Sequence, residues 1–139
     1  MTSRKGAPTR PILAQSREQL HGGAACDRRG AARGAQYGGY EPLPGIRVNG
    51  RVTAGENIGD NGGLQVARYA YEMSLGGQPS PTVEGFSGDQ RFFLGFAQVW
   101  RSLIRDQALR NQVLTDPHSP AEYRCNGTVR NMDSWYTAF

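Results

Sequence analysis

Apolar residues recur at helical spacing through the middle of the chain, and this pattern predicts a long helix. Thr53 and Glu56 match the T-x-x-E capping box that often opens a helix. The apolar positions that follow are Ile58, Leu64, Val66, Ala67, Ala70 and Met73. Apolar side chains with this periodicity line one face of a helix. We therefore expect the first helix to begin at Thr53.

The predicted helix contains glycines that its own stability does not explain. They are Gly55, Gly59, Gly62 and Gly63. A glycine inside a helix costs roughly 1 kcal/mol relative to alanine. Glycine is favoured where a second backbone approaches closely. We therefore expect this helix to pack tightly against another segment in a protein interior.

Three further helices are predicted after a glycine- and proline-rich loop at residues 76–85. Ser87 and Gln90 repeat the capping pattern, and the apolar run after them predicts a helix that reaches Ile104. Residues 106–114 predict a third helix. Residues 131–139, with Asn131 as the cap, predict a short last one.

The segment before the first helix is predicted to be extended. Pro42 and Pro44 fix their own φ angles and restrict the residues before them. Asn49-Gly50 lies between short alternating stretches and is typical of a hairpin turn. The fold class is therefore predicted as mainly α, with a short extended or hairpin segment.

The first 34 residues differ in composition from the rest of the chain. They carry seven Lys or Arg and two acidic residues, a net charge of +5, whereas residues 35–139 have a net charge of −1. Their content of Gly, Ala and Arg offers little apolar surface to offset the entropy of ordering. We predict a disordered basic leader at 1–34 and one domain at 35–139.

Composition also excludes several functional classes. Because the basic residues are concentrated in the leader, the charge of the domain gives no support to nucleic-acid binding. No apolar run approaches the roughly 20 residues of a membrane-spanning helix, and the start of the chain lacks the apolar core of a secretory signal. Cys26 and Cys125 lie far apart, which indicates neither a disulfide scaffold nor a close metal spacing. The sequence therefore assigns no compartment.

Two carboxylates share one face of the first predicted helix. Glu56 and Asp60 are four residues apart, so their like charges weaken an isolated helix. Glu56 can be explained as a helix cap and Asp60 as a surface carboxylate. Alternatively, the pair faces a cation, such as a metal ion or a metal-bound histidine.

His118 lies in the turn D-P-H-S-P, where Pro117 and Pro120 restrict the backbone on both sides. A lone histidine is more often structural than catalytic. A rigid turn, however, holds a side chain in the fixed direction that a transition state requires of a donor. Arg124 follows six residues later. By itself it indicates a surface arginine or a partner for a carboxylate.

Four motifs together resemble the C-terminal part of the neprilysin-like zinc metallopeptidases, a family that includes neprilysin, endothelin-converting enzyme and bacterial oligopeptidases. The motifs are VNGRVTAGENIGDNGGL, GFSGDQRFFLGFAQVWRS, TDPHSPAEYRCNG and NMDSWYTAF. They occur in the family's order and spacing. The resemblance covers roughly residues 36–139 and implies the helical, zinc-bearing lobe of such an enzyme.

The resemblance implies a role for each candidate residue. Glu56 matches the third zinc ligand of the family, and Asp60 matches the partner that orients a zinc-binding histidine. His118 matches the residue that stabilises the oxyanion. The remaining residues would bind substrate: Arg124 would contact a substrate carbonyl, and Val99 and Trp100 would line the pocket for the residue after the cleaved bond.

The family's zinc signature, H-E-x-x-H, is absent from this chain. It supplies two histidine ligands and the general-base glutamate. We therefore expect a C-terminal portion of a zinc metalloendopeptidase, with Zn²⁺ as cofactor and peptides as substrates only in the complete enzyme. We expect the isolated chain to be inactive, and its partner to be the missing N-terminal half. The alternative is a non-catalytic homologue or binding module that reuses the scaffold.

Overall fold

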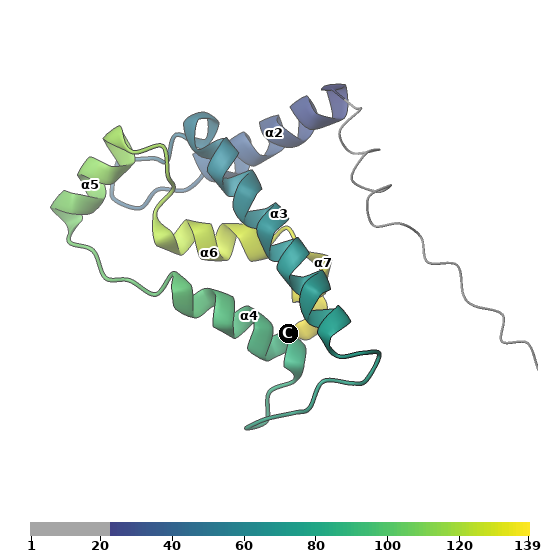
Figure 1. The fold of residues 1–139 in the computed structure, drawn as a ribbon. Coiled ribbons are helices and arrows are strands. Elements are labelled where there is room, and N and C mark those ends of the chain that lie inside the picture. Colours follow the sequence, from purple (N-terminus) through teal and green to yellow (C-terminus); the bar gives the residue numbers. More distant parts are fainter. Residues whose placement is uncertain (1–22) are drawn as a thin grey trace, which may run out of the picture.

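The computed structural model describes residues 23–139, and this part of the chain is mainly helical (Figure 1). Its helices are α2 (Gly23–Gly38), α3 (Gly50–Ser74), α4 (Gly88–Val99), α5 (Asp106–Thr115), α6 (Ala121–Val129) and α7 (Asp133–Ala138). The described residues form no sheet, and their only strand-like pairings are two isolated bridges, Leu43–Ile46 and Val83–Phe86. The predicted helical fold class is confirmed.

The long helix α3 begins earlier than the sequence predicts. Asn49 is its N-cap, and the Asn49 side chain accepts a hydrogen bond from the Val52 backbone N–H at 3.2 Å. Thr53 therefore lies inside the helix, where its hydroxyl donates to the Asn49 carbonyl. The predicted cap at Thr53 and the hairpin at Asn49-Gly50 are both wrong, because the Asn49 side chain caps a helix here.

The chain does reverse direction in the extended segment, in a turn at residues 43–46. The Ile46 backbone N–H donates to the Leu43 carbonyl at 2.9 Å, which closes a four-residue turn. Gly45 has a φ of +74°. Proline followed by a glycine with positive φ is the signature of a type II turn, and Pro44-Gly45 supplies it.

Helix α2 corrects part of the predicted leader. Residues 23–34 are helical, so the prediction of disorder is wrong for them; residues 1–22 lie outside the described part. The helix is held by tertiary contacts that local composition does not reveal. A Cβ atom at Gly50 of α3 would overlap the Gly34 backbone of α2. The two backbones can approach this closely because the residue at the contact on α3 is glycine. Tyr37 of α2 is fully buried.

The second predicted helix begins as expected and ends sooner. Ser87 and Gln90 form the reciprocal capping box at the start of α4. The helix stops at Val99 rather than at Ile104. Helix α5 confirms the third predicted helix within one residue at its C-terminal end. Figure 1 shows α5 at the end of a long connection, away from the other helices, and none of its residues is buried.

The apolar core lies where α3, α4 and α6 meet the start of α7. Leu64, Phe93, Val129 and Met132 are its buried residues, and Trp135 packs beside them. Helix α6 was not predicted, since the sequence was interpreted there only as a turn. Helix α7 has Met132 rather than Asn131 as its cap. Of the apolar positions that predicted α3, only Leu64 is buried.

The buried face of α3 is largely polar. Thr53, Asn57 and Asn61 are buried at successive turns. Asn61 donates to the Thr128 carbonyl of α6 and accepts from Arg33 of α2. These hydrogen bonds tie the N-terminal half of α3 to its neighbours and fix the direction of its other faces. No helix among residues 23–139 is long and apolar enough to cross a membrane.

Candidate active site

Helix α6 and the turn before it bring His118 and Arg124 to the carboxylates of α3. Arg124 forms a two-pronged ion pair with Asp60, in which Nε donates to Oδ2 and Nη2 donates to Oδ1, each at 2.6 Å. Both side chains are largely shielded, with 15% and 12% of their surface exposed. A paired and shielded arrangement of this kind is geometrically specific. It fixes α6 against α3 beside Glu56.

Glu56 lies one helical turn before Asp60 and faces His118. The Glu56 Oε2 atom is 3.3 Å from His118 Nε2 and 3.6 Å from Arg124 Nη2. The Glu56 and His118 side chains remain about half exposed. Because α3 begins at Gly50 with Asn49 as its cap, Glu56 lies inside the helix and does not cap it. Its carboxylate is available to a further ligand, with a cationic group on one side and an imidazole on the other.

Asp116 is a member of the cluster that the sequence interpretation missed. Its Oδ1 atom accepts the His118 backbone N–H at 2.8 Å and lies 2.6 Å from His118 Nδ1. The backbone N–H of His118, followed by its ring, lowers the pKa of the Asp116 carboxyl. The signal was present in the sequence, because an aspartate readily bonds the backbone two residues later. Asp116 thereby sets the direction of the His118 ring.

Trp100 belongs to the cluster, but Val99 does not. The Arg124 guanidinium lies over the Trp100 ring, 4.5 Å from its centroid, a cation–π geometry. The hydrogen bonds that Arg124 donates to Asp60 raise the pKa of Arg124 above its usual value. Val99, by contrast, is 75% exposed. The structure thus brings together Glu56, Asp60, His118, Arg124 and Trp100, and leaves Val99 facing outward.

The described residues do not by themselves fit a zinc ion. They contain no group of three His, Cys, Asp or Glu side chains placed to share one metal. A zinc site of the catalytic type needs three protein ligands and one open position. Asp60, for which the sequence predicts a contact with a zinc-bound histidine, has both oxygens bonded to Arg124. Of the two α3 carboxylates in the cluster, Glu56 is the one left open to such a metal.

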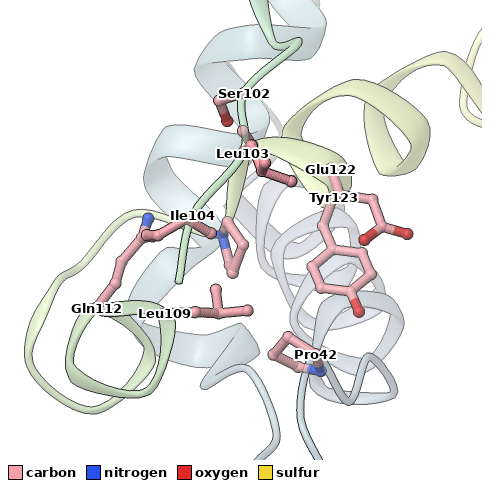
Figure 2. Close-up of a pocket in the computed structure, with 10 residues that line it drawn as sticks. Pro42, Ser102, Leu103, Ile104, Leu109, Gln112, Glu122 and Tyr123 are labelled. Atoms are coloured by element: carbon pink, nitrogen blue, oxygen red, sulfur yellow. The ribbon is translucent and has the colours of Figure 1, made fainter. Parts of the chain in front are cut away.

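A pocket lies close to the cluster but outside it (Figure 2). Its volume is about 350 Å³, and Pro42 and Tyr123 face Leu103, Ile104 and Leu109 across it. None of the six clustered side chains, Asp116 included, lines this pocket. The candidate chemistry therefore sits on an open face of α3 and α6 and not in the cavity.

A continuous stripe on α3 has no partner among the described residues. Its positions alternate at spacings of three and four: Val52, Gly55, Gly59, Gly62, Val66, Tyr69 and Met73. The four large side chains are each at least 55% exposed, and a Cβ atom on any of the three glycines would meet nothing within 4 Å. We call these seven positions the α3 seam. The close packing that the sequence predicts at these glycines is not made within residues 23–139.

The comparisons with known proteins give one consistent family. The sequence model of peptidase family M13 matches residues 26–139, so the match begins within the predicted leader. Human endothelin-converting enzyme 1 is 44% identical over 107 residues, which is 75% of this chain and 14% of that enzyme. Neprilysin-11 of Caenorhabditis elegans is 40% identical over 105 residues, 72% of this chain and 12% of that protein. The chain therefore spans about one seventh of the length of these curated relatives, or less.

A solved structure has the same arrangement of helices. The crystal structure of the Mycobacterium tuberculosis zinc metalloprotease Zmp1, in complex with an inhibitor, superposes with a TM-score of 0.80 and 45% sequence identity. The match covers 83% of this chain and 18% of that one. The described helices thus correspond to one part of a much larger metalloprotease.

Proposed function

The chain belongs to peptidase family M13, and from this premise we propose that it forms the C-terminal part of a zinc metalloendopeptidase that hydrolyses peptide bonds. The observation that carries the proposal is the cluster itself. Residues from α3, α6 and the connecting turn converge with Glu56 next to His118 and Asp60 paired with Arg124. A scaffold retained only for its shape would not need this arrangement of charges.

In the complete enzyme Glu56 would be the zinc ligand that this chain contributes. The metal would polarise the peptide carbonyl and activate a water molecule. The two remaining ligands and the general base would come from the H-E-x-x-H sequence that this chain lacks. Because Glu56 is half exposed and bonded only weakly at 3.3 Å and 3.6 Å, its carboxylate can turn toward a metal at little cost.

His118 would donate to the oxygen that gains negative charge as the peptide carbonyl is attacked. With its Nδ1 proton held by Asp116, the ring presents Nε2 to the site. Nε2 then carries a proton to donate only when the ring holds both protons. Donors fixed in advance at such a position contribute strongly to catalysis.

Arg124 would bind a substrate carbonyl, with its orientation set by Asp60 and Trp100. A guanidinium held at Nε and Nη2 by one carboxylate still has its Nη1 protons free of that pair. Asp60 would therefore act on both sides of the site, since it lies beside the zinc ligand and holds the substrate-binding arginine. Val99 is the weakest of the proposed substrate contacts because its side chain is 75% exposed and takes no part in the cluster.

The N-terminal part of the complete enzyme is the proposed partner, and the α3 seam is the surface we assign to it. Apolar residues repeated every 3.5 positions are the pattern of a helix that receives a second helix. Glycines at the N-terminal end of the seam permit a close approach beside Glu56. Without this partner we propose that the chain is inactive, since it holds one of the three ligands.

A chimera tests the proposed function. Residues 36–139 replace the matching segment of Zmp1, which supplies the remainder of a metalloprotease; we call this protein the Zmp1 chimera. Peptide hydrolysis and zinc content are measured together, and Glu56→Ala should lose both. Hydrolysis by the chimera supports the peptidase. A folded, zinc-loaded chimera without hydrolysis would favour the alternative, a non-catalytic homologue or binding module.

A further inference from the structure

A buried hydrogen bond joins the two segments that carry the candidate site. Asn57 follows Glu56 on α3, and Ser119 follows His118 in the turn before α6. The side-chain amide Nδ2 of Asn57 donates to Ser119 Oγ at 3.0 Å. Asn57 is fully buried and Ser119 is 1% exposed. The bond therefore lies directly behind the open face on which Glu56 and His118 meet.

The surroundings of Asn57 determine which way its amide points. The same Nδ2 atom donates to Thr53 Oγ1 at 3.1 Å. The Thr53 hydroxyl has already given its proton to the Asn49 carbonyl. Thr53 can therefore only accept from Asn57. This arrangement aims the two amide protons at the two hydroxyls and leaves Ser119 as the acceptor that belongs to the turn.

The contact on the open face cannot hold the geometry by itself. The Glu56 and His118 side chains are 48% and 42% exposed, and exposed ion pairs contribute roughly 0–1 kcal/mol. Pro117 and Pro120 stiffen the turn but make no bond to α3. A hydrogen bond shielded from water is stronger and geometrically stricter. The Arg124–Asp60 pair fixes α6 against α3, and the buried bond is the contact that ties the turn itself to α3.

We propose that Asn57 and Ser119 are positioning residues, and that their hydrogen bond holds the His118 turn against α3 so that His118 Nε2 faces the Glu56 carboxylate. The consequence for catalysis rests on the proposed function, because it requires that Glu56 binds the metal and that His118 donates to the oxyanion. The consequence for geometry does not, since it concerns only the distance between two side chains of this chain.

The geometric part is tested on the chain itself by NMR. The measured quantity is the cross-relaxation signal between the Glu56 side chain and the His118 ring. Ser119→Ala, which removes the acceptor of the turn, should weaken this signal several-fold or abolish it. Thr53→Val is the matched control, because it removes the other acceptor of the same amide and leaves the bond between α3 and the turn. The control should keep the signal.

Folding of each variant is checked from its amide spectrum. If Ser119→Ala does not fold, Ser119→Cys preserves the volume and offers only a weak acceptor, and the signal should then be reduced rather than lost. An undiminished signal in a folded Ser119→Ala or Ser119→Cys variant would overturn the proposal. Equal weakening in Thr53→Val and Ser119→Ala would also overturn it, because the effect would then be a general loosening of α3.

The catalytic part is tested in the Zmp1 chimera. Ser119→Ala should lower kcat by on the order of 10- to 100-fold, the scale for a misplaced catalytic group, with KM and zinc content nearly unchanged. Ser119→Thr, which restores a hydroxyl, should recover part of that loss. In a chimera that already carries His118→Ala, Ser119→Ala should have little further effect, since the residue would act through His118.

The outcomes separate the two proposals. An inactive parent chimera would count against the proposed function, and the NMR signal would still decide the geometric role of Asn57 and Ser119. An active parent in which Ser119→Ala lowers kcat equally with and without His118 would overturn the positioning role and leave the peptidase standing.

Discussion

Arg124 of α6 and Asp60 of α3, which are 64 residues apart in sequence, are joined by two hydrogen bonds of 2.6 Å each. This pair lies beside the Trp100 ring and borders Glu56. It connects the fold to the chemistry, because one contact both fixes a helix pair and orients a candidate substrate-binding group.

The first prediction concerns the stability of the chain when this pair is broken. Asp60→Asn removes the closer negative charge and leaves the shielded Arg124 guanidinium with only the Glu56 carboxylate, 3.6 Å from Nη2. Hydrogen bonds to charged groups contribute roughly 1.5–3 kcal/mol, so we expect the free energy of unfolding to fall by about that amount. Urea denaturation followed by circular dichroism measures it.

The control for that prediction is a second arginine–carboxylate ion pair that is exposed to solvent. Arg47 and Glu41 lie 3.2 Å apart with 67% and 39% of their side chains exposed. Glu41→Gln should leave the unfolding midpoint almost unchanged. If Asp60→Asn changed stability no more than Glu41→Gln, the pair would be a surface contact and its role in fixing α6 would be refuted.

The second prediction compares two glycines of α3. Gly50→Ala places a Cβ atom into the Gly34 backbone, and rigid backbone cannot yield as a side chain can. We expect a loss of roughly 1–3 kcal/mol, the usual scale for overpacking. Gly62→Ala meets open space in this chain and should stabilise it by up to about 1 kcal/mol through higher helix propensity. Thermal unfolding of both variants decides between the two environments.

The same position tests the seam in a complete enzyme. Gly62→Leu should be tolerated by the isolated chain, where the seam is open. In the Zmp1 chimera it should lower the melting temperature, because a large side chain would hold the second helix away. Equal melting temperatures for the chimera with and without the change would show that nothing packs closely at Gly62.

Local rules predicted those elements whose determinants lie within a few residues. The reciprocal bonds of Ser87 and Gln90 involve neighbours only, and α4 begins where the capping rule puts it. The start of α3 was predicted at Thr53, and Asn49-Gly50 was predicted as a hairpin turn, whereas Asn49 caps the helix. The packing of Gly50 against α2, which a local pattern does not reveal, accompanies the earlier start.

Elements that depend on distant contacts could not be predicted locally. Helix α2 has few apolar residues, so no periodic pattern predicts it. It is held by the packing of Gly34 against Gly50 and by the hydrogen bond that the Gln36 side chain donates to the Gly127 carbonyl. Helix α6 contains Gly127, which lowers its helix propensity. The Tyr37 ring occupies the space that a Cβ atom would need there. In both cases the explanation is a partner more than twelve residues away.

The sequence predicted the residues of the candidate site more completely than it predicted the helices around them. Motifs named Glu56, Asp60, His118 and Arg124, and the structure brings all four together. Their roles in catalysis stay predictions. The partners were less accessible to sequence reasoning, because the sequence indicated a carboxylate partner for Arg124 without identifying it as Asp60. Asp116 lies two residues from His118 and could have been found from the Asx-turn rule.

The third prediction separates the proposed roles of Glu56 and His118. In the Zmp1 chimera, His118→Ala should keep its zinc and lower kcat by on the order of 100- to 1,000-fold, the scale for a lost oxyanion donor. Glu56→Ala should lose its zinc. Metal content and single-turnover rates are measured on the same preparations. Loss of zinc from His118→Ala would assign that residue to the metal instead.

Asp60→Ala and Arg124→Ala complete that comparison. Asp60→Ala should weaken zinc affinity or activity by roughly 10- to 100-fold, as expected for a group that supports a metal site from outside its ligands. Arg124→Ala should lower kcat/KM, with part of the loss appearing as a higher KM. An Arg124→Ala chimera with unchanged kcat/KM would remove the substrate-binding role.

The last prediction concerns acid pH and the turn that carries His118. Hydrogen bonding to the His118 backbone N–H, and then to its ring, holds the pKa of the Asp116 carboxyl below its usual value of 3.8. Because folding lowers this pKa, the stabilisation of the turn is complete above pH 3.8 and is lost as the pH falls through the lower folded-state pKa. The chemical shift of the His118 backbone amide should therefore change with a midpoint below pH 3.8, and Asp116→Asn, which cannot ionise, should abolish this transition. If the transition that Asp116→Asn abolishes had its midpoint at or above pH 3.8 in the unmodified chain, the Asp116 carboxylate would not be bonded to His118 in solution.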